Sequence, residues 1–493
     1  MERSSALTRR RFLGYLGGIT GGTIALGLAA CGGAATGGKP TAPPTNSASS
    51  DLPDWLAQQA KPFKGRTVSV VASQQYFATA NQDFVTACNK FGELTGTTVQ
   101  VSTINVDTGN LVTRQDAAVK ARNVQDMAFV DSSRFVSQLQ QLGDLEPVTD
   151  VVKELEGKYG AAHDVNRIYL TKGNDWYGIP FFSLVNGAFA RKDWLQEKGI
   201  KTSDFITHPK TYVQMRDIAL EISDPSQQRY GWGITYNGSG DGNGFILGVL
   251  NAYGAAVASN DGTKVVFGSG PETEEAVRFI SDTYSNPKYS KMIPPGVQSW
   301  TDPSNNQAWL AGLIGFTFNA YSLYAQSRAQ NNPVYDKTLT FGGLLGPAIT
   351  EVLDIPASES FVIFKSAKEP GLAKVLAKYL VYGSPLLSMV KDSTGLILPA
   401  YTNIWNSNSY YLNGDQAFKS QHQVLVQPLP IKAKTGLSFP QAPSPGGQAV
   451  NTAYPLSDMI GQIVTKKASV KDAIATCKQR IIQIFEQQGL PQR

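Results

Sequence analysis

The side chains of this sequence that could do chemistry are suited to binding a polar ligand. Gln75 and Tyr76 directly follow the apolar run T-V-S-V-V-A, which is typical of a buried strand. Asp131 and Arg134 directly follow a second such run, M-A-F-V. Because ligands of parallel sheets bind beyond the carboxyl ends of the strands, these four side chains are candidates for ligand contacts. For the Asp and Ser residues at these points, capping of the next helix is an equal alternative.

A glycine-rich stretch, Asn237–Gly244, gives a second group of candidates. Its spacing is not G-x-G-x-x-G and no P-loop Lys follows it, which argues against a phosphate site. We expect a loop that brings its backbone, and Asp241 or Asn243, close to a polar ligand. A plain turn is an equal alternative for this stretch.

Groups that would support catalysis or metal binding are missing from the sequence. It has no G-x-S-x-G elbow and no Walker motif, and its three Cys and three His are scattered without C-x-x-C or H-E-x-x-H spacing. We therefore expect no enzyme activity, no metal and no cofactor, although acidic pairs leave a glycosidase open. Cys88 and Cys477 lie on apolar helical faces, where two buried thiols are expected. A disulfide between them would need Cα atoms within about 7 Å.

The formal net charge of +5 is concentrated at the amino terminus. Residues 1–30 carry four Arg and one Glu, a charge of +3, so the rest of the chain carries only +2. Such a near-neutral balance gives no electrostatic footprint for nucleic acid. The 493 residues are too many for one hydrophobic core, and two or three domains are expected.

Residues 1–30 have the order of an export signal. The cluster Arg9-Arg10-Arg11 resembles a twin-arginine signal, although an ordinary secretory signal also begins with basic residues. An uncharged apolar run of about 15 residues follows, shorter than the roughly 20 that span a bilayer. Leu28–Gly32 resembles the lipobox of bacterial lipoproteins, so Cys31 is the expected lipidation site. Residues 31–61 would then be the lipidated Cys and a flexible linker, on the outer face of the cytoplasmic membrane or in the periplasm.

Hydrophobic periodicity predicts the elements that position these groups. An alternation of strands and helices comes first, which argues for a parallel sheet covered by helices. We expect strands at 67–72, 97–102 and 127–130 and helices at 81–94, 110–121 and 133–142. A second series is expected with strands at 187–191, 230–236 and 315–318, helices at 211–222, 245–253 and 271–284, and a final amphipathic helix at 469–488.

The stretch Tyr177-Gly178-Ile179-Pro180 stands between the two series and is predicted to carry the backbone from one lobe to the other. Pro180 fixes one backbone angle and Gly178 leaves another free, as expected of a hinge. Gly346-Pro347 is the second candidate crossing. A ligand is expected in the cleft that these crossings create.

Seven motifs in order resemble the type 1 extracellular solute-binding proteins of ABC importers, typified by maltose-binding and other sugar-binding proteins. The stretch Asp175–Pro180, for example, is similar to the family's D-G-K-x-Y-G-I-P. The resemblance covers roughly residues 62–490 and is carried by Asp175–Pro180, Phe189–Gly199, Pro209–Tyr212, Gly254–Ala276, Trp309–Phe318, Gly343–Pro347 and Phe361–Lys368.

Two departures fall at positions that line the cleft in the family. Pro356–Ser360 replaces the usual glycine pair, and Tyr321 or Tyr324 stands where a Trp is usual. The ligand therefore cannot be copied from any relative.

The resemblance implies a two-lobed α/β fold of the type II periplasmic-binding-protein class, each lobe a mainly parallel sheet flanked by helices, with the ligand cleft between them. The first lobe would comprise residues 62–178 and 346–395, and the second 182–342 and 400–490. It also implies a small-molecule solute, most simply a mono- or oligosaccharide, that is delivered to the permease subunits of an ABC transporter. We expect a monomer, held at the membrane by the N-terminal lipid.

A sugar site needs aromatic platforms for the C–H faces of the sugar and planar hydrogen-bonding groups for its polar rim. For each aromatic residue, packing in the core is at least an equal alternative. The expected platforms are Tyr76, Phe182, Tyr236, Tyr321 and Tyr454. The expected hydrogen-bonding groups are Gln75, Asp131, Arg134, Asn237, Asp241, Asn319 and Glu359.

The alternatives are another solute, such as a polyamine, a peptide or a metal chelate, and a surface glycan hydrolase or adhesin. A polyamine site would need several clustered carboxylates. As a test of the sugar site, Tyr321→Ala is expected to weaken binding and to leave the fold intact. Unchanged affinity in a binding titration would remove Tyr321 from the site.

Overall fold

The computed structural model describes residues 51–492 except for 76, 106–110, 131–132, 185, 349–352, 355–356, 394–395, 407–419, 421–431 and 434–443. The predicted export signal, the lipidation site Cys31 and the first part of the linker lie outside the described residues, as do Tyr76 and Asp131. For Arg134 only the backbone is described. Among the described residues, no helix is long and apolar enough to cross a membrane.

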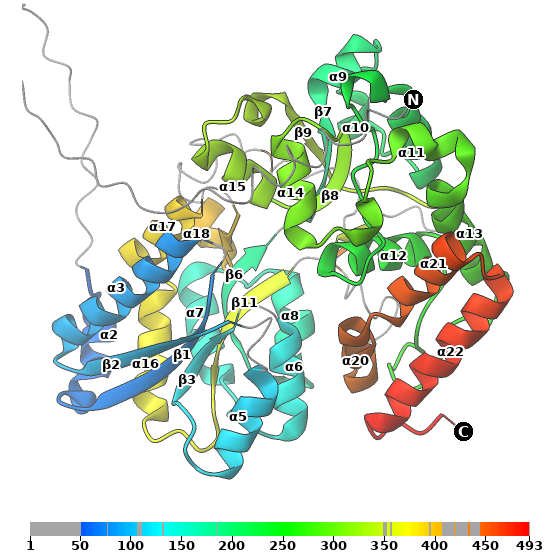
Figure 1. Ribbon diagram of the computed structural model, residues 1–493. Helices are drawn as coiled ribbons and strands as arrows, with labels where there is room; N and C mark the ends of the chain where they lie inside the picture. The colour runs from blue at the N-terminus through cyan, green and yellow to red at the C-terminus, as the bar shows by residue number, and fades with distance from the viewer. Residues whose placement is uncertain are drawn as a thin grey trace, which may run out of the picture. The chain divides into compact units, whose positions relative to one another are not determined.

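The first lobe is built on a six-stranded sheet with the order β12-β6-β11-β3-β1-β2 (Figure 1). Strand β1 pairs in parallel with β2 and β3, while β11 is antiparallel to both β3 and β6. Since β3 and β6 are each antiparallel to β11, they run in the same direction, and the sheet is mainly parallel. The strands are β1 (Thr67–Ser73), β2 (Thr98–Ile104), β3 (Met127–Val130), β6 (Ile179–Leu184), β11 (Ala357–Ile363) and β12 (Leu398–Pro399).

Helices cover both faces of this sheet (Figure 1). One layer contains α3 (Ala78–Thr95), α16 (Pro370–Leu380) and α17 (Gly383–Asp392). The other contains α5 (Leu111–Lys120), α6 (Ser133–Leu142) and α8 (Asp164–Leu170). The helices α2 (Asp54–Ala60), α7 (Thr149–Tyr159) and α18 (Thr402–Asn406) pack around these layers. The predicted strand and helix alternation of this lobe is confirmed, with ends that differ by a few residues.

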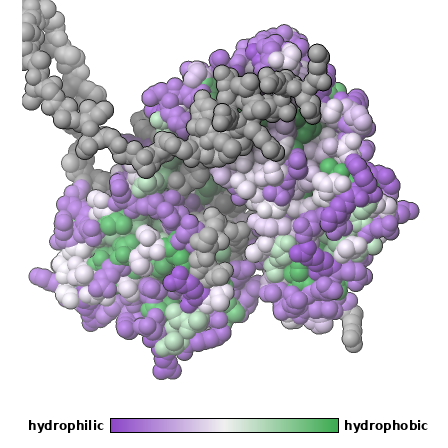
Figure 2. All heavy atoms as spheres, in the orientation of Figure 1, coloured by the Kyte–Doolittle hydropathy of each residue, from purple (hydrophilic) through white to green (hydrophobic). Residues whose placement is uncertain are grey.

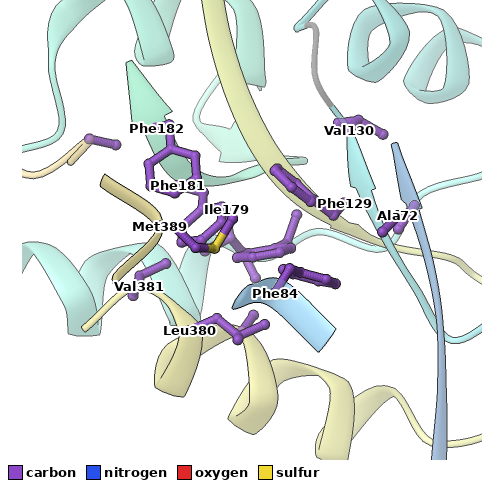
Figure 3. Close-up of a cluster of buried hydrophobic side chains, with 14 of the residues drawn as sticks. Ala72, Phe84, Phe129, Val130, Ile179, Phe181, Phe182, Leu380, Val381 and Met389 are labelled. Atoms are coloured by element: carbon purple, nitrogen blue, oxygen red, sulfur yellow. The ribbon is translucent and has the colours of Figure 1, made fainter. Parts of the chain in front are cut away.

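The core of the first lobe is a cluster of aromatic rings between the sheet and its helices (Figure 3). All four residues of β3 are buried, as expected for a strand covered on both faces. The Phe129 ring stacks on Phe84 at a centroid distance of 5.1 Å and meets Phe181 edge-on at 5.3 Å. Phe361 of β11 lies 5.4 Å from Phe129 and completes the cluster.

The second lobe has a three-stranded sheet with the order β8-β7-β9. Both ladders are antiparallel, which departs from the mainly parallel sheet that was predicted for this lobe. The outer strands run in the same direction and are joined by a helical crossover, but β7 is inserted between them with the opposite direction. The strands are β7 (Asn186–Arg191), β8 (Phe316–Ala320) and β9 (Thr338–Phe341).

Helices from two separate parts of the chain surround this second sheet. The first part supplies α9 (Lys192–Glu197), α10 (Asp204–Thr207), α11 (Tyr212–Glu221), α12 (Gly240–Ala252), α13 (Pro271–Ser285), α14 (Asp302–Leu310) and α15 (Ser322–Ala329). The carboxyl-terminal part supplies α20 (Pro445–Ala453), α21 (Pro455–Lys466) and α22 (Val470–Gln487). The predicted final helix is therefore confirmed as α22.

The strand predicted at 230–236 is wrong. Only Tyr230 forms a bridge, with Ile314, and the following residues have no regular structure, although the Gly233 N–H donates to the Phe316 carbonyl of β8 at 2.8 Å. Gly231 passes so close to α11 that an added Cβ would lie 1.8 Å from the carbonyl oxygen of Ala219. Close packing against neighbouring elements, rather than a strand ladder, therefore explains why this segment contains glycine.

The predicted first crossing must be moved. Ile179 and Pro180 begin β6, which remains in the first sheet as far as Leu184, so the chain changes sheet between Leu184 and Asn186. The ladder shifts its register at Glu359 and Ser360, opposite Pro180, which has no N–H to donate. Gly178 is held by close packing, since an added Cβ would lie 3.0 Å from a methyl of Leu170.

The second predicted crossing also lies elsewhere. Gly346 packs against α12, where an added Cβ would come within 2.0 Å of the carbonyl oxygen of Ala252. The Ala348 N–H donates to the same oxygen at 3.4 Å. The chain therefore returns to the first lobe after Ala348 and before β11. By their sheets and helices, residues 51–184 and 357–406 belong to the first lobe, and 186–348 and 444–492 to the second, which corrects the predicted boundaries.

Cys88 and Cys477 are both free and buried, as predicted. Burial raises the pKa of the Cys88 thiol well above its usual range and that of Cys477 to about 12. Both thiols therefore behave as small core side chains.

The buried carboxylate of Asp126 holds β1 to the start of α16. It accepts hydrogen bonds from the Ser69 N–H at 2.8 Å and hydroxyl at 2.7 Å, and from the N–H groups of Lys368 and Glu369 at 2.7 and 2.8 Å. Because these donors would lose a charged acceptor, Asp126→Ala should lower the free energy of unfolding by about 3 kcal/mol in urea titrations. The exposed Asp217 of α11 is the matched control, with an effect of Asp217→Ala within about 0.5 kcal/mol. Equal effects of the two substitutions would contradict this role of Asp126.

Candidate functional site

The structure brings five of the predicted site residues together around the amino-terminal end of α12. Tyr236 and Asn237 precede this helix, Asp241 lies in its first turn, and Asn319 is linked to Asp241 through one side chain. Tyr454, between α20 and α21, packs against Gly238. This region of the second lobe is therefore the candidate functional site.

The predicted glycine-rich loop is in large part helical, because α12 begins at Gly240. The Ser239 hydroxyl caps the helix by accepting from the Gly242 N–H at 3.1 Å. The Asp302 carboxylate of α14 accepts from the N–H groups of Gly240 at 3.2 Å and Asp241 at 2.9 Å. Gly242 is needed because an added Cβ would lie 2.2 Å from the carbonyl oxygen of Asn237.

An amide network, formed by Asp241, Asn305, Asn306, Asn319 and Ser322, joins α12 and α14 to the end of β8. The Asn305 amide donates to the Asp241 carboxylate at 2.7 Å and accepts from the Asn319 amide at 3.0 Å. The Asn319 amide also donates to Asn306, and its carbonyl accepts from the Ser322 hydroxyl at 3.0 Å. The three Asn side chains are buried, so each hydrogen bond restricts the others to one orientation.

Sequence reasoning found Asp241 and Asn319 but missed Asn305 and Asn306. A signal was present, since two consecutive Asn residues inside a helix are unfavourable without a specific role. The resulting arrangement offers amide and carboxylate groups of fixed geometry at the carboxyl end of β8. Such groups can donate to and accept from hydroxyl groups of a ligand.

The Asp241 carboxyl is the most strongly perturbed acid that the structure describes in this region. Burial, and secondarily the neighbouring Asp302 carboxylate, raise its pKa to about 7, although the hydrogen bond from Asn305 opposes the shift. Near neutral pH this group therefore exchanges between an acceptor-only carboxylate and a carboxyl that can also donate.

Tyr236, Asn237 and Tyr454 form the aromatic and polar border of the site. The Tyr236 ring packs edge-on against Tyr284 at 4.7 Å and is largely buried, which raises the pKa of its hydroxyl. The Asn237 amide donates to the Trp300 carbonyl at 3.0 Å. Tyr454 ends α20 in a left-handed conformation, with φ of 51°, and its N–H donates to the Val450 carbonyl; this conformation is uncommon for a residue other than Gly or Asn.

The candidates of the first lobe lie at the first sheet. Gln75 follows β1, as predicted, and its N–H donates to the Asn81 side chain at 2.8 Å. Phe182 of β6 and Glu359 of β11 are register partners, and both are buried. Phe182 stacks on Phe181 at 3.8 Å within the core cluster, so packing accounts for this ring and the structure gives it no exposed face for a ligand (Figure 3). Its role as a platform stays a prediction.

Tyr321 lies in the core rather than at a surface. It is 0% exposed, meets Phe189 edge-on at 5.3 Å and stacks on Tyr324 at 5.8 Å. Removal of a buried aromatic ring costs about 3–5 kcal/mol, so Tyr321→Ala would not leave the fold intact as expected from the sequence. The contribution of Tyr321 to binding stays a prediction.

Two cavities adjoin the predicted residues. One of about 450 Å³ lies beside α21 and includes Tyr236 and Asn237 in its wall. The other, of about 330 Å³, is bordered by α6, α8 and Tyr177, with Pro445 at the start of α20. The described residues contain no group of three or more His, Cys, Asp and Glu side chains placed to hold a metal ion.

Comparison with known proteins identifies relatives of the chain. The family model described as bacterial extracellular solute-binding protein matches residues 72–381. An ABC transporter periplasmic-binding protein of Escherichia coli, YcjN, is 34% identical over 98 residues, which cover 20% of this chain and 21% of the relative. The matched stretch therefore spans about a fifth of that relative's length.

Solved structures share the fold over most of the chain. An ABC transporter solute-binding protein of Thermotoga lettingae TMO bound to alpha-D-tagatose has a TM-score of 0.68 at 18% identity, covering 85% of this chain and 100% of that one. A solute-binding protein of Agrobacterium radiobacter K84 in complex with ribitol has a TM-score of 0.68 at 15% identity, covering 86% of this chain and 100% of that one. Maltose-bound MalE3 of T. maritima has a TM-score of 0.66 at 15% identity, covering 85% of this chain and 99% of that one. The predicted two-lobed α/β fold is thus confirmed.

The raised pKa of Asp241 makes a prediction about stability. The folded chain binds the Asp241 proton more tightly than an ordinary Asp, so this contribution to stability is full below about pH 4 and is lost as the pH rises through about 7. Relative to Asp241→Asn, which does not titrate, the wild-type chain should lose free energy of unfolding over this range, as measured by urea titration at several pH values. Asp217→Asn on the exposed face of α11 is the control. A pH-independent difference between wild type and Asp241→Asn would contradict the expectation.

Proposed function

The chain belongs to the bacterial extracellular solute-binding proteins, and we propose that its solute is a carbohydrate or polyol, bound between the two lobes and delivered to an ABC importer. The solved structures with the same fold, whose ligands include a ketose, a polyol and a disaccharide, support this class of solute. The observation that carries the proposal is the amide network at α12, beside Tyr236 and Tyr454.

The chemistry of that region matches a polyhydroxylated ligand. Each sugar hydroxyl both donates and accepts a hydrogen bond, and a side-chain amide such as that of Asn237 also offers both groups. Aromatic rings at the border suit the apolar C–H faces of a sugar. Asp241, which exchanges its proton near neutral pH, can serve either as acceptor or as donor. From the first lobe, Gln75 and Glu359 are the proposed contacts, together with Tyr76, Asp131 and Arg134.

Binding would be coupled to closure of the lobes about the segments where the chain changes sheet. These are the passage between Leu184 and Asn186 and the return between Ala348 and Ala357. A solute shifts this equilibrium only by the difference between its affinities for the closed and open states. A micromolar affinity corresponds to roughly 8 kcal/mol, which is ample for such a shift.

The amino-terminal segment would keep the binding protein near its importer. Export by the signal in residues 1–30 and lipidation of Cys31 would leave a tether that ends at α2. A random coil of 19 residues, the number between Cys31 and Asp51, would span roughly 24 Å. The anchored domain would thus reach the permease while remaining free to rotate. The proposed role involves no turnover of the solute.

A thermal-shift experiment tests the solute class. The purified chain would be screened with D-tagatose, ribitol, D-mannitol, maltose and mannotriose, and in parallel with spermidine, peptides and metal chelates. We expect the Tm to rise with at least one sugar or polyol, by the equivalent of about 2.7 kcal/mol at a hundredfold excess over Kd. A shift with spermidine alone would overturn the carbohydrate assignment. Products of cleavage after incubation with oligosaccharides would overturn the binding role itself.

The ring of Tyr454 can be tested without changing its backbone. Asn tolerates the left-handed conformation, so Tyr454→Asn removes the ring and keeps the turn between α20 and α21. If the ring contacts the solute, the affinity measured by calorimetry should fall roughly tenfold. Gln228→Asn, at another left-handed position with φ of 58°, is the matched control and should bind as wild type does. Equal affinity of both variants would exclude Tyr454 from the site.

A further inference from the structure

The cavity of about 450 Å³ beside α21 is not explained by the proposed binding between the lobes. Asp241, Asn319 and Tyr321 do not border it. Its wall comes from the extended segment before α12, from Gln298 and from α21. The volume lies within the range of small-molecule sites, about 300–1,000 Å³. The residues that border it are Tyr236, Asn237, Gly238, Gln298, Ser457, Asp458, Gly461, Gln462, Thr465 and Lys466.

The face of α21 toward this cavity is polar along its whole length. Ser457, Gly461 and Thr465 are spaced four residues apart and therefore lie on one side of the helix. The apolar residues Leu456, Met459, Ile460 and Ile463 are buried in the core of the lobe. Figure 2 shows that hydrophilic residues predominate on the surface around α21 and α22 in this view, with small hydrophobic patches between them. An apolar occupant would therefore find few matching groups.

Two amide side chains in the wall are available for a ligand. Neither the Gln298 amide, which is exposed to solvent, nor the half-buried Gln462 amide is hydrogen-bonded to another described residue. The charge of Asp458 is balanced by an ion pair with Arg480. The Ser457 hydroxyl donates to the Asn237 carbonyl at 3.2 Å and can still accept a bond from a ligand. The wall thus offers donors and acceptors with little net charge, apart from Lys466 at its rim.

Gly461 keeps the cavity open. It lies in the middle of α21, where Gly costs about 1 kcal/mol relative to Ala. An added Cβ would meet no heavy atom within 4 Å, so packing does not require Gly at this position. Gly157 of α7 also meets no heavy atom, but it does not border this cavity. What distinguishes Gly461 is that a side chain there would enter a polar cavity.

We propose that this cavity is an accessory site for a neutral, polyhydroxylated molecule of mono- or disaccharide size. The unpaired amides of Gln298 and Gln462 would bind its hydroxyl groups, Tyr236 would form one wall, and the absence of a side chain at Gly461 would admit it. The site is separate from the solute site proposed between the lobes, although both use the segment that contains Asn237.

The stoichiometry of binding tests the proposal. Equilibrium dialysis of the purified chain with labelled maltose, and separately with D-mannitol, should give two equivalents bound per chain with one of these probes. Gly461→Leu, which places the side chain of a good helix former in the cavity, should bind one equivalent. Gly157→Leu is the matched control and should bind two. The Tm of each variant would be measured to show that both are folded.

The possible results separate this proposal from the proposed function. One equivalent in the wild type and in both variants would overturn the accessory site and leave the site between the lobes in place. One equivalent in the wild type and none in Gly461→Leu would support the accessory site and overturn the other. Binding of neither probe would overturn the accessory site, whereas the solute site is judged by the wider thermal-shift screen.

The proposed ligand contacts can be tested by removing the side-chain amide of Gln462. Gln462→Ala should weaken the second equivalent roughly fivefold, which is the loss expected for one hydrogen bond, and leave the first unchanged. If Gln462→Ala bound the second equivalent as tightly as the wild type does, a role for this amide would be contradicted. If inorganic phosphate bound instead, and Lys466→Gln abolished that binding, the neutral ligand class would be wrong.

Discussion

Two carboxylates hold α12 and α14 together, and the rest of the candidate site depends on this pairing. Asp302 of α14 accepts from the free N–H groups at the start of α12, and Asp241 of α12 accepts from Asn305 of α14. Thus α14 supplies an acceptor for the backbone of α12, and α12 supplies an acceptor for a side chain of α14. The position of Asn305 fixes the Asn319 amide at the end of β8, and the start of α12 fixes Asn237. The second carboxylate carries a cost, because burial and the neighbouring charge disfavour the ionised form of Asp241.

The sequence predicted the local elements of the first lobe well, because apolar periodicity is a local property. Strand β3 and helix α6 begin and end where the pattern predicted. The same reasoning failed where long-range packing decides. Gly231 looked like part of a strand, but it is required by the carbonyl oxygen of Ala219, which comes from α11. No local pattern contains that information.

The candidate site was predictable only in part, for a related reason. A polar residue after a strand, such as Asn319, can be expected near a ligand, but its partners Asn305 and Asn306 are chosen by the fold. The roles of aromatic residues are still harder to predict, because Tyr321 and Tyr454 are chemically identical in the sequence. Only the structure shows that Tyr321 is enclosed by Phe189 and Tyr324, whereas Tyr454 adopts a left-handed backbone beside Gly238.

The order of strands in the first sheet has a consequence for how the chain can fold. β11 lies between β3 and β6, yet it is separated from them in the sequence by most of the second lobe. The sheet therefore lacks its strand between β3 and β6 until residues 357–363 have been synthesised. The Asp126 carboxylate likewise cannot accept from the N–H groups of Lys368 and Glu369 until those residues have been synthesised. Pairing over such sequence distances makes folding slow. A nascent chain would thus leave the first sheet incomplete until most of the second lobe has been synthesised.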